Sequence, residues 1–160
     1  MKKIIYILIM IIALANNSFS AGTSSDTDSS SEYTKAYNLI KSAKKYEKKG
    51  KTEKALKRYS KAQKLLIESN KKKPLQADTL NYLGFTTRKL GDYEKGEAFY
   101  LLGLQIDPNH NGINEYLGEL YVFTGRISLA KERLEILKNC GCKEYTELKE
   151  IIEGTKKSKY

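Results

Sequence analysis

The chain has 160 residues and a formal net charge of +10, from 29 Lys and Arg residues against 19 Asp and Glu residues. This length is enough for one domain with its own core. Its two cysteines alone do not supply the four ligands of a structural zinc site, which argues against a metal-stabilised domain.

The first twenty residues have the pattern of a signal peptide. Lys2 and Lys3 precede an unbroken apolar run over residues 4–15, and small residues follow it. A signal peptidase accepts small side chains one and three places before the cut, so we predict cleavage after Ser20 and export, to the periplasm. The run of twelve apolar residues is shorter than the roughly 20 of a membrane-spanning helix. Retention as an uncleaved anchor stays open as the alternative.

Two further segments have little to bury. Residues 21–32 are mostly Ser, Thr and Asp and predict a flexible leader, because such a stretch cannot offset its ordering entropy. Residues 154–160 predict a disordered tail. Between them, residues 33–153 are rich in Lys, Leu, Glu, Ala and Tyr, and the only prolines are Pro74 and Pro108. This composition is typical of helices.

A repeat with a period of 34 residues organises this helical region. The motif Tyr-Leu-Gly at residues 82–84 recurs at residues 116–118, and Gly91 recurs as Gly125. Further matches at the same offset pair Gly96 with Ala130, Tyr100 with Leu134, and Gly103 with Leu137. Such a period indicates stacked supersecondary units.

Each unit reads as a pair of helices. In the middle unit we expect a helix over residues 78–90, a turn at Gly91 with Asp92 as the next helix's cap, and a second helix from Tyr93 that ends before Pro108. The following pair is expected over residues 111–123 and 127–139. A degenerate first unit precedes them, with an extended second helix and a loop near residues 70–76.

The spacing resembles the tetratricopeptide repeat. The match over residues 77–110 includes Leu83, Gly84 and Pro108, and the match over residues 111–144 includes Leu117 and Gly118. Residues that depart from the pattern are Thr87, Asn114 and Cys142. The resemblance implies an all-α, right-handed superhelical solenoid of three helix pairs, at about residues 35–76, 77–110 and 111–142, with a capping helix at 143–153.

Small residues recur where the helices of a pair would cross closely. They are Gly84, Gly96, Gly118 and Ala130. A larger side chain at such a crossing would push the helices apart, at a cost of roughly 1–3 kcal/mol. We therefore assign these positions to the core rather than to a binding site.

Cys140 and Cys142 stand between the last repeat helix and the cap, separated by one glycine. In an exported protein paired cysteines usually form a disulfide. A local disulfide, separate thiols or intermolecular bonds, and a thiol exchange role all stay open, and a metal site is the weakest reading. Leader, repeats and this junction together resemble small envelope proteins of Gram-negative bacteria that carry such repeats.

No catalytic constellation is visible, and we expect neither an enzyme nor a cofactor. The one histidine, His110, follows Pro108 and most simply starts a helix. The acidic residues Asp92, Glu94 and Glu97 lie at a predicted helix start, where the macrodipole favours them. No glycine-rich phosphate loop is present.

The positive charge is concentrated in the first unit. Residues 35–73 contain 15 Lys or Arg and 3 acidic residues, whereas residues 74–153 contain 9 and 13. A solvated lysine-rich face is the simplest explanation; a docking surface for an acidic partner or an anionic membrane, and nucleic-acid binding, are the alternatives. Export argues against nucleic acid.

The resemblance also predicts a binding surface. In this family the first helix of each pair lines a concave groove for a partner's segment, so we predict a non-catalytic protein-binding scaffold of the bacterial envelope, without a small-molecule substrate. Thiol-disulfide exchange and self-assembly are the alternatives. Since Ile40 and Lys44 replace the Lys and Asn of the family's carboxylate clamp, that specificity is not expected. The predicted groove residues, with Tyr37 and Phe85 as aromatic anchors, are Tyr37, Ile40, Lys44, Glu47, Asp78, Asn81, Phe85, Arg88, Glu115, Glu119 and Val122.

Overall fold

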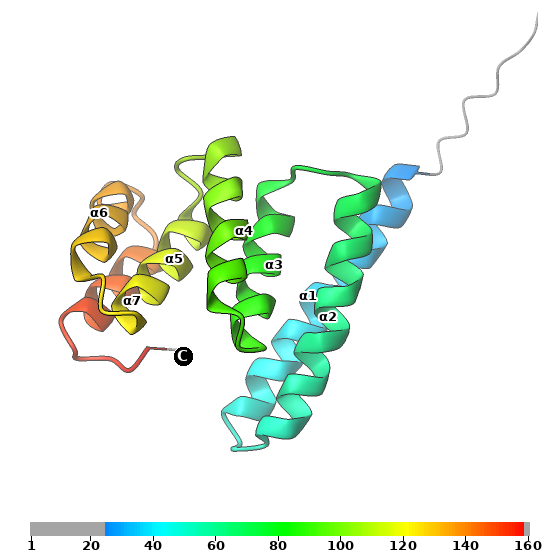
Figure 1. Cartoon of the computed structure of the whole chain (residues 1–160), viewed down its shortest axis with the longest axis horizontal. Coiled ribbons are helices and arrows are strands. Elements are labelled where there is room, and N and C mark those ends of the chain that lie inside the picture. The colour runs from blue at the N-terminus through cyan, green and yellow to red at the C-terminus, as the bar shows by residue number, and fades with distance from the viewer. Residues whose placement is uncertain (1–24, 159–160) are drawn as a thin grey trace, which may run out of the picture.

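The computed structural model describes residues 25–158, which form seven α-helices and no strand (Figure 1). The predicted signal peptide, residues 1–20, lies outside the described residues. None of the described helices is long and apolar enough to cross a membrane. The helices are α1 (Ser25–Glu47), α2 (Thr52–Lys72), α3 (Ala77–Lys89), α4 (Tyr93–Ile106), α5 (Asn111–Phe123), α6 (Ile127–Leu137) and α7 (Lys143–Ile152).

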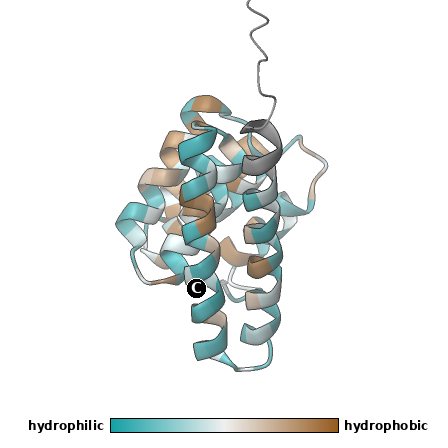
Figure 2. Ribbon diagram, turned by 90° about the vertical axis from the view of Figure 1, so that its right-hand side faces the viewer, coloured by the Kyte–Doolittle hydropathy of each residue, from teal (hydrophilic) through white to brown (hydrophobic). Residues whose placement is uncertain are grey.

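The helices pack as three consecutive pairs, α1 with α2, α3 with α4, and α5 with α6, and α7 packs on the last pair (Figure 1). Polar and apolar residues alternate along the helices, so that each buries one face and leaves another to solvent (Figure 2). The predicted all-α repeat solenoid with a C-terminal capping helix is confirmed.

The first pair is the longest, with 23 residues in α1 and 21 in α2. The second helix is extended as predicted, but it continues to Lys72, into the segment that was predicted to be a loop. The interface of this pair contains small residues: Ala36 and Ala43 of α1 and Ala55 and Ala62 of α2 are fully buried. Short side chains let two long helices approach closely along their length. The connection to α3 contains Leu75, which has a positive φ of 58° and is exposed.

Glycines permit the close crossing of α3 and α4. A Cβ on Gly84 would lie 2.5 Å from the ring of Tyr100, and one on Gly96 would lie 3.2 Å from the carbonyl oxygen of Gly84. For Gly118 the expected neighbour was α6, and that prediction was wrong. A Cβ there would meet Leu148 of α7, because the capping helix packs directly on α5.

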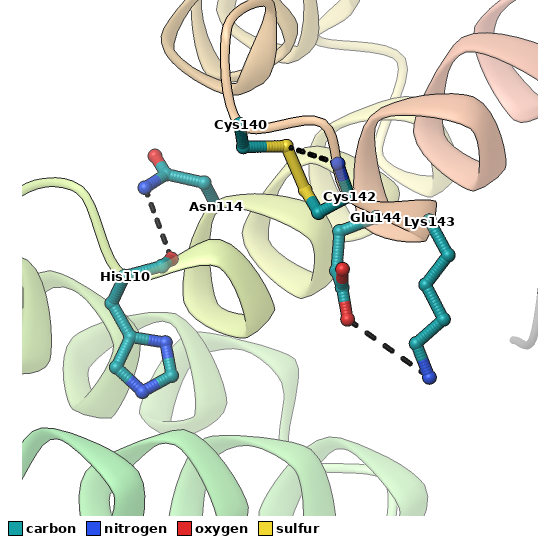
Figure 3. The surroundings of a disulfide bond; sticks show 6 residues. All are labelled: His110, Asn114, Cys140, Cys142, Lys143 and Glu144. Carbon is teal, nitrogen blue, oxygen red and sulfur yellow. Dashed lines mark hydrogen bonds and ion pairs between the residues drawn. A yellow bond between two sulfur atoms is a disulfide. The ribbon is translucent and has the colours of Figure 1, made fainter.

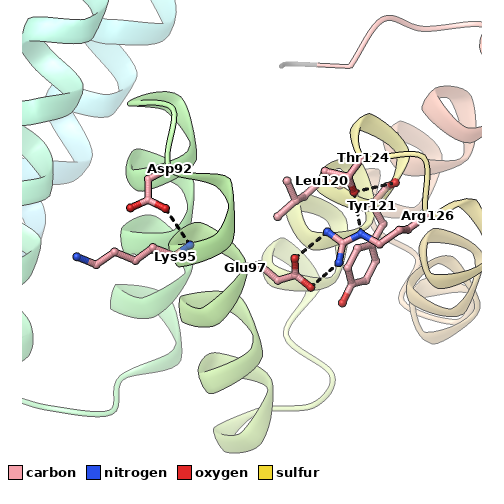
Figure 4. A network of polar contacts seen from close by, with 7 residues as sticks. All are labelled: Asp92, Lys95, Glu97, Leu120, Tyr121, Thr124 and Arg126. Atoms are coloured by element: carbon pink, nitrogen blue, oxygen red, sulfur yellow. Dashed lines mark hydrogen bonds and ion pairs between the residues drawn. The ribbon is translucent and has the colours of Figure 1, made fainter.

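Side chains at the helix starts set the turns between helices. Asp92 accepts a hydrogen bond from the Lys95 N–H at 3.0 Å, as predicted for a cap (Figure 4). His110 starts α5, and its Nδ1 accepts from the Ile113 N–H at 3.2 Å. Arg126, just before α6, donates to both carboxylate oxygens of Glu97 at 2.8 and 2.7 Å (Figure 4). Glu97 thus joins two helix pairs rather than only neutralising a helix start.

Both ends of the repeat domain differ from expectation. The flexible leader was predicted to reach residue 32, but α1 begins at Ser25. Once a helix has formed, each further residue adds a hydrogen bond and only that residue has to be ordered. The disordered tail was predicted from residue 154, yet residues 154–156 form a hydrogen-bonded turn on the end of α7. The last repeat helix ends at Leu137, two residues before the predicted end.

Candidate partner-binding surface

The first helices of the three pairs lie next to one another, with α3 in contact with both α1 and α5. We call the surface that they form the first-helix face. It carries all the predicted groove residues, and several of them are exposed or half-buried: Tyr37, Lys44, Glu47, Asp78 and Val122. The others are buried: Ile40, Asn81, Phe85, Arg88, Glu115 and Glu119.

Phe85 is the centre of an aromatic cluster on this face. Its ring lies 5.6 Å from that of Tyr59 and 5.0 Å from that of Tyr116, measured between centroids. The Lys44 ammonium stands 4.5 Å from the Phe85 ring centroid and donates to the Tyr116 hydroxyl at 2.9 Å. Phe85 is therefore a core residue that links three helix pairs, and the aromatic anchor that remains exposed is Tyr37.

A buried ion pair lies beside this cluster. An Nη atom of Arg88 is 3.2 Å from a carboxylate oxygen of Glu119, and both side chains are fully buried. The guanidinium also lies 5.0 Å from the Phe85 ring and 5.1 Å from the Tyr116 ring. Stacking on two aromatic faces suits the planar, weakly hydrated guanidinium.

A second charged group connects α1, α2 and α3. Glu47 accepts a hydrogen bond from the Tyr59 hydroxyl at 2.7 Å and pairs with the Lys89 ammonium at 2.7 Å. Burial, and then the hydrogen bond to Glu47, raise the pKa of Tyr59. Burial also raises the pKa of Tyr116, so both phenols are neutral at physiological pH and act as hydrogen-bond donors or acceptors, not as bases.

Glu47 and Lys89 border a cavity of about 410 Å³ at the C-terminal ends of α1 and α3. Phe85 forms an apolar wall, and cations stand around it. The lining also includes Ser158, which follows α7 and is 111 residues away from Glu47 in sequence. We call this space the first-helix cavity; its lining residues are Lys44, Glu47, Lys48, Thr52, Phe85, Lys89 and Ser158.

Tyrosines and a histidine occupy the opposite end of the face. The Tyr37 and Tyr82 rings lie 5.6 Å apart. His110 Nε2 is 3.2 Å from a carboxylate oxygen of Asp78, and since Nδ1 accepts from a backbone N–H, Nε2 is the donor. This hydrogen bond lowers the pKa of Asp78. The arrangement holds α3 to the start of α5.

Cys140 and Cys142 form a disulfide between the end of α6 and the start of α7 (Figure 3). The Cys142 N–H donates to the Cys140 sulfur at 3.1 Å. Of the open interpretations, the structure shows the local bond. Within residues 25–158 there is no group of three or more His, Cys, Asp or Glu side chains that could hold a metal ion.

The outer side of the first pair is a separate, basic surface. A shallow pocket there is bounded by Leu39 and Tyr46 and by four cationic side chains. The Arg58 guanidinium lies 5.0 Å from the Tyr46 ring centroid. A hydrogen bond from Arg58 lowers the pKa of Tyr46. The four cations are Lys54, Lys57, Arg58 and Lys61.

Sequence reasoning placed Arg88 and Glu119 on the first-helix face but missed their pairing. They are 31 residues apart, close to one repeat, so opposite charges at nearly equivalent positions of successive first helices were the available signal. Ser158 gave no such signal, because its place depends on the turn after α7.

Comparison with known proteins identifies a tetratricopeptide repeat at residues 77–110, the α3–α4 pair. The first tetratricopeptide domain of Spaghetti (RPAP3), solved with the HSP90 peptide SRMEEVD, is 19% identical, with 77% of this chain and 94% of that chain covered and a TM-score of 0.49. Its second domain, solved with the same peptide, is 17% identical, with 68% of this chain and 94% of that chain covered and a TM-score of 0.43. The first tetratricopeptide domain of human RPAP3, solved by NMR, is 19% identical, with 79% of this chain and 98% of that chain covered and a TM-score of 0.49. A comparison with curated protein sequences gives no match.

Proposed function

Since the α3–α4 pair is a tetratricopeptide repeat within an all-α repeat chain, we propose that the protein is a non-catalytic scaffold that docks a segment of another protein on its first-helix face. The first-helix cavity is the observation that carries the proposal. It places the Phe85 ring among Lys44, Lys48 and Lys89, a combination of apolar and charged groups that suits a protein segment.

The chemistry of the described residues supports binding over catalysis. Three titratable groups of the first-helix cavity are engaged with other side chains: Lys44 with Tyr116, and Glu47 with Lys89. Burial raises the pKa values of the two phenols that bond these groups, Tyr59 and Tyr116, so neither phenol is a ready base or nucleophile at neutral pH.

We further propose that the scaffold acts outside the cytoplasm, in the bacterial envelope. The disulfide between Cys140 and Cys142 supports this location, because such bonds persist in oxidising compartments. The mature protein should begin at Ala21. Mass spectrometry of protein taken from the periplasmic fraction tests this, and a species that retains residues 1–20 contradicts cleavage.

Site-specific photo-crosslinking tests the docking proposal. A photoreactive residue replaces Thr52, which is exposed and lines the first-helix cavity, or Leu101, 44% exposed on α4, as the matched control. We expect the same protein to be captured from position 52 and not from position 101. Lys48→Glu should weaken capture, whereas Lys64→Glu, an equal charge change on the exposed side of α2, should not. Equal capture from both positions overturns the proposal.

The disulfide supplies an alternative, thiol-disulfide exchange, because Cys140 and Cys142 are both only half-buried. A reduction potential near that of the compartment supports exchange, whereas a potential far below it indicates a structural bond. The bond joins the last repeat helix to the cap, and this position favours the structural role.

The basic outer surface of α1 and α2 supports a weak contact with an anionic membrane. Lys54, Lys57, Arg58 and Lys61 gather there around Tyr46 and Leu39. Such contacts are screened by salt, so vesicles with anionic lipid should bind the protein at low ionic strength and release it as salt is added. Binding to neutral vesicles but not to anionic vesicles would contradict this contact.

A further inference from the structure

The chain does not leave the molecule after α7. The Gly154 N–H donates to the Ile151 carbonyl at 3.2 Å, and the Thr155 N–H donates to the Glu150 carbonyl at 3.0 Å. With Gly154 at φ +73°, these two bonds form a Schellman cap, which ends the helix and reverses the chain. The segment then turns back toward the middle of the molecule (Figure 1).

This reversal directs the following residues to the first-helix face. Lys156 lies 3.4 Å from a carboxylate oxygen of Glu150, which holds the start of the segment against α7. Two residues later Ser158 lines the first-helix cavity together with Lys44, Phe85 and Lys89. Residues 154–158, which we call the post-α7 segment, therefore connect the capping helix to the first repeat.

The Phe85 ring, 1% exposed, is covered by Tyr59 and Tyr116 of the neighbouring helices, so its burial does not depend on the post-α7 segment. The exposed part of the cavity lining includes Lys48. The post-α7 segment reaches this lining through Ser158.

We propose that the post-α7 segment covers one side of the first-helix cavity within the same chain, and that a partner segment must displace it to bind. The proposal rests on the proposed function for the identity of the competing site, although the intrachain contact itself does not depend on a partner. While the segment covers the cavity, a partner cannot bind there. The apparent affinity for a partner is therefore the intrinsic affinity multiplied by the fraction of molecules in which the cavity is open.

Gly154 provides a sharp test in the full-length chain. A Cβ at this position meets nothing within 4 Å, so Gly154→Ala disturbs only the positive-φ turn that directs the segment. Gly125→Ala is the matched control, because Gly125 has φ +76° and equally open surroundings but lies in the turn before α6. A third variant lacks residues 154–160.

Hydrogen exchange gives a readout that needs no partner. We expect residues 44–52 and 85–89 to exchange about tenfold faster in Gly154→Ala and in the deletion variant than in the Gly125→Ala control. A synthetic peptide of residues 154–160 should restore the slow exchange in the deletion variant, and a scrambled peptide should not. Unchanged exchange in both variants, or equal acceleration by Gly125→Ala, overturns the proposal.

Two further outcomes separate this proposal from others. Protection that increases with protein concentration shows that the segment occupies a second copy of the chain, which overturns the intrachain contact. If crosslinking from position 52 captures a partner equally with and without residues 154–160, the intrachain cover is wrong and the scaffold function stands. If exchange responds as expected and no partner is ever captured, the scaffold function fails and the intrachain contact stands.

Discussion

Arg88 of α3 and Glu119 of α5 form an ion pair, 3.2 Å between nitrogen and oxygen, with both side chains fully buried. The pair joins the first helices of two successive repeats. Burial of two charges is favourable only while each has the other, because each ion would otherwise lose its hydration without compensation. The stacking of these repeats therefore depends on both residues together.

Glu119→Leu should lower the free energy of unfolding by about 3–5 kcal/mol, since it leaves the Arg88 guanidinium buried without this carboxylate. Urea denaturation followed by circular dichroism measures the change. The double variant Arg88→Met with Glu119→Leu should lose less than the sum of the two single variants, because neither charge of the pair is then buried without the other. Additive losses would contradict the coupling.

Gly84→Ala should destabilise the protein by about 1–3 kcal/mol, because the added Cβ would lie 2.5 Å from the fully buried Tyr100 ring. Thermal unfolding measures this loss. In a Tyr100→Leu background the side chain facing Gly84 is smaller, so the same substitution should cost less. An equal cost in both backgrounds would show that the ring is not the source of the strain.

Tyr100→Phe should stabilise the protein by about 1 kcal/mol. The Tyr100 hydroxyl is buried and makes no hydrogen bond with the described residues. Removing an unsatisfied buried hydroxyl while keeping the ring removes a desolvation cost of about 1–3 kcal/mol. Tyr59→Phe is the matched control and should destabilise, because the Tyr59 hydroxyl donates to Glu47.

The repeat architecture followed from the spacing of large and small residues. A 34-residue period located the α3–α4 and α5–α6 pairs, because each repeat must bury the same helix faces against its neighbours. The neighbour of Gly118 was not predictable in this way. The last repeat has no successor, and Leu148 of the cap takes a position that the period does not describe.

The site was less predictable than the fold. Periodicity placed Phe85 and Arg88 on the first-helix face, but it could not show that both are buried, since burial depends on what else reaches that face. Ser158 reaches it through the cap at Gly154. A polar, lysine-rich sequence predicts disorder unless a helix end directs it back onto the protein.

Loss of the disulfide should cost little stability. The bond between Cys140 and Cys142 closes a loop of only three residues, for which the chain-entropy estimate is about 1–2 kcal/mol. A reductant should therefore lower the melting temperature by a few degrees without loss of helix content. The Cys140→Ser and Cys142→Ser double variant should melt at that lower temperature with and without reductant. Loss of helical structure on reduction would contradict this.

Alkaline pH should destabilise the protein through its buried tyrosines. Burial, and then the neighbouring Tyr37, raise the pKa of Tyr82 to about 12. An unfolded tyrosine has a pKa of about 10, so between about pH 10 and pH 12 the unfolded state loses the proton first. The folded state then binds more protons, and the stability that this group contributes is lost as the pH rises through this window.

Tyr82→Phe should therefore reduce the steepness of the alkaline loss, measured by urea denaturation at a series of pH values from 9 upward. Tyr46→Phe should change this slope in the opposite direction, because a hydrogen bond from Arg58 lowers the pKa of Tyr46 and so favours its phenolate in the folded state. That variant should show a slightly steeper loss, small because the Tyr46 side chain is still partly exposed to solvent. Identical slopes for both variants would show that the environments of the two phenols do not differ in the way that the structure indicates.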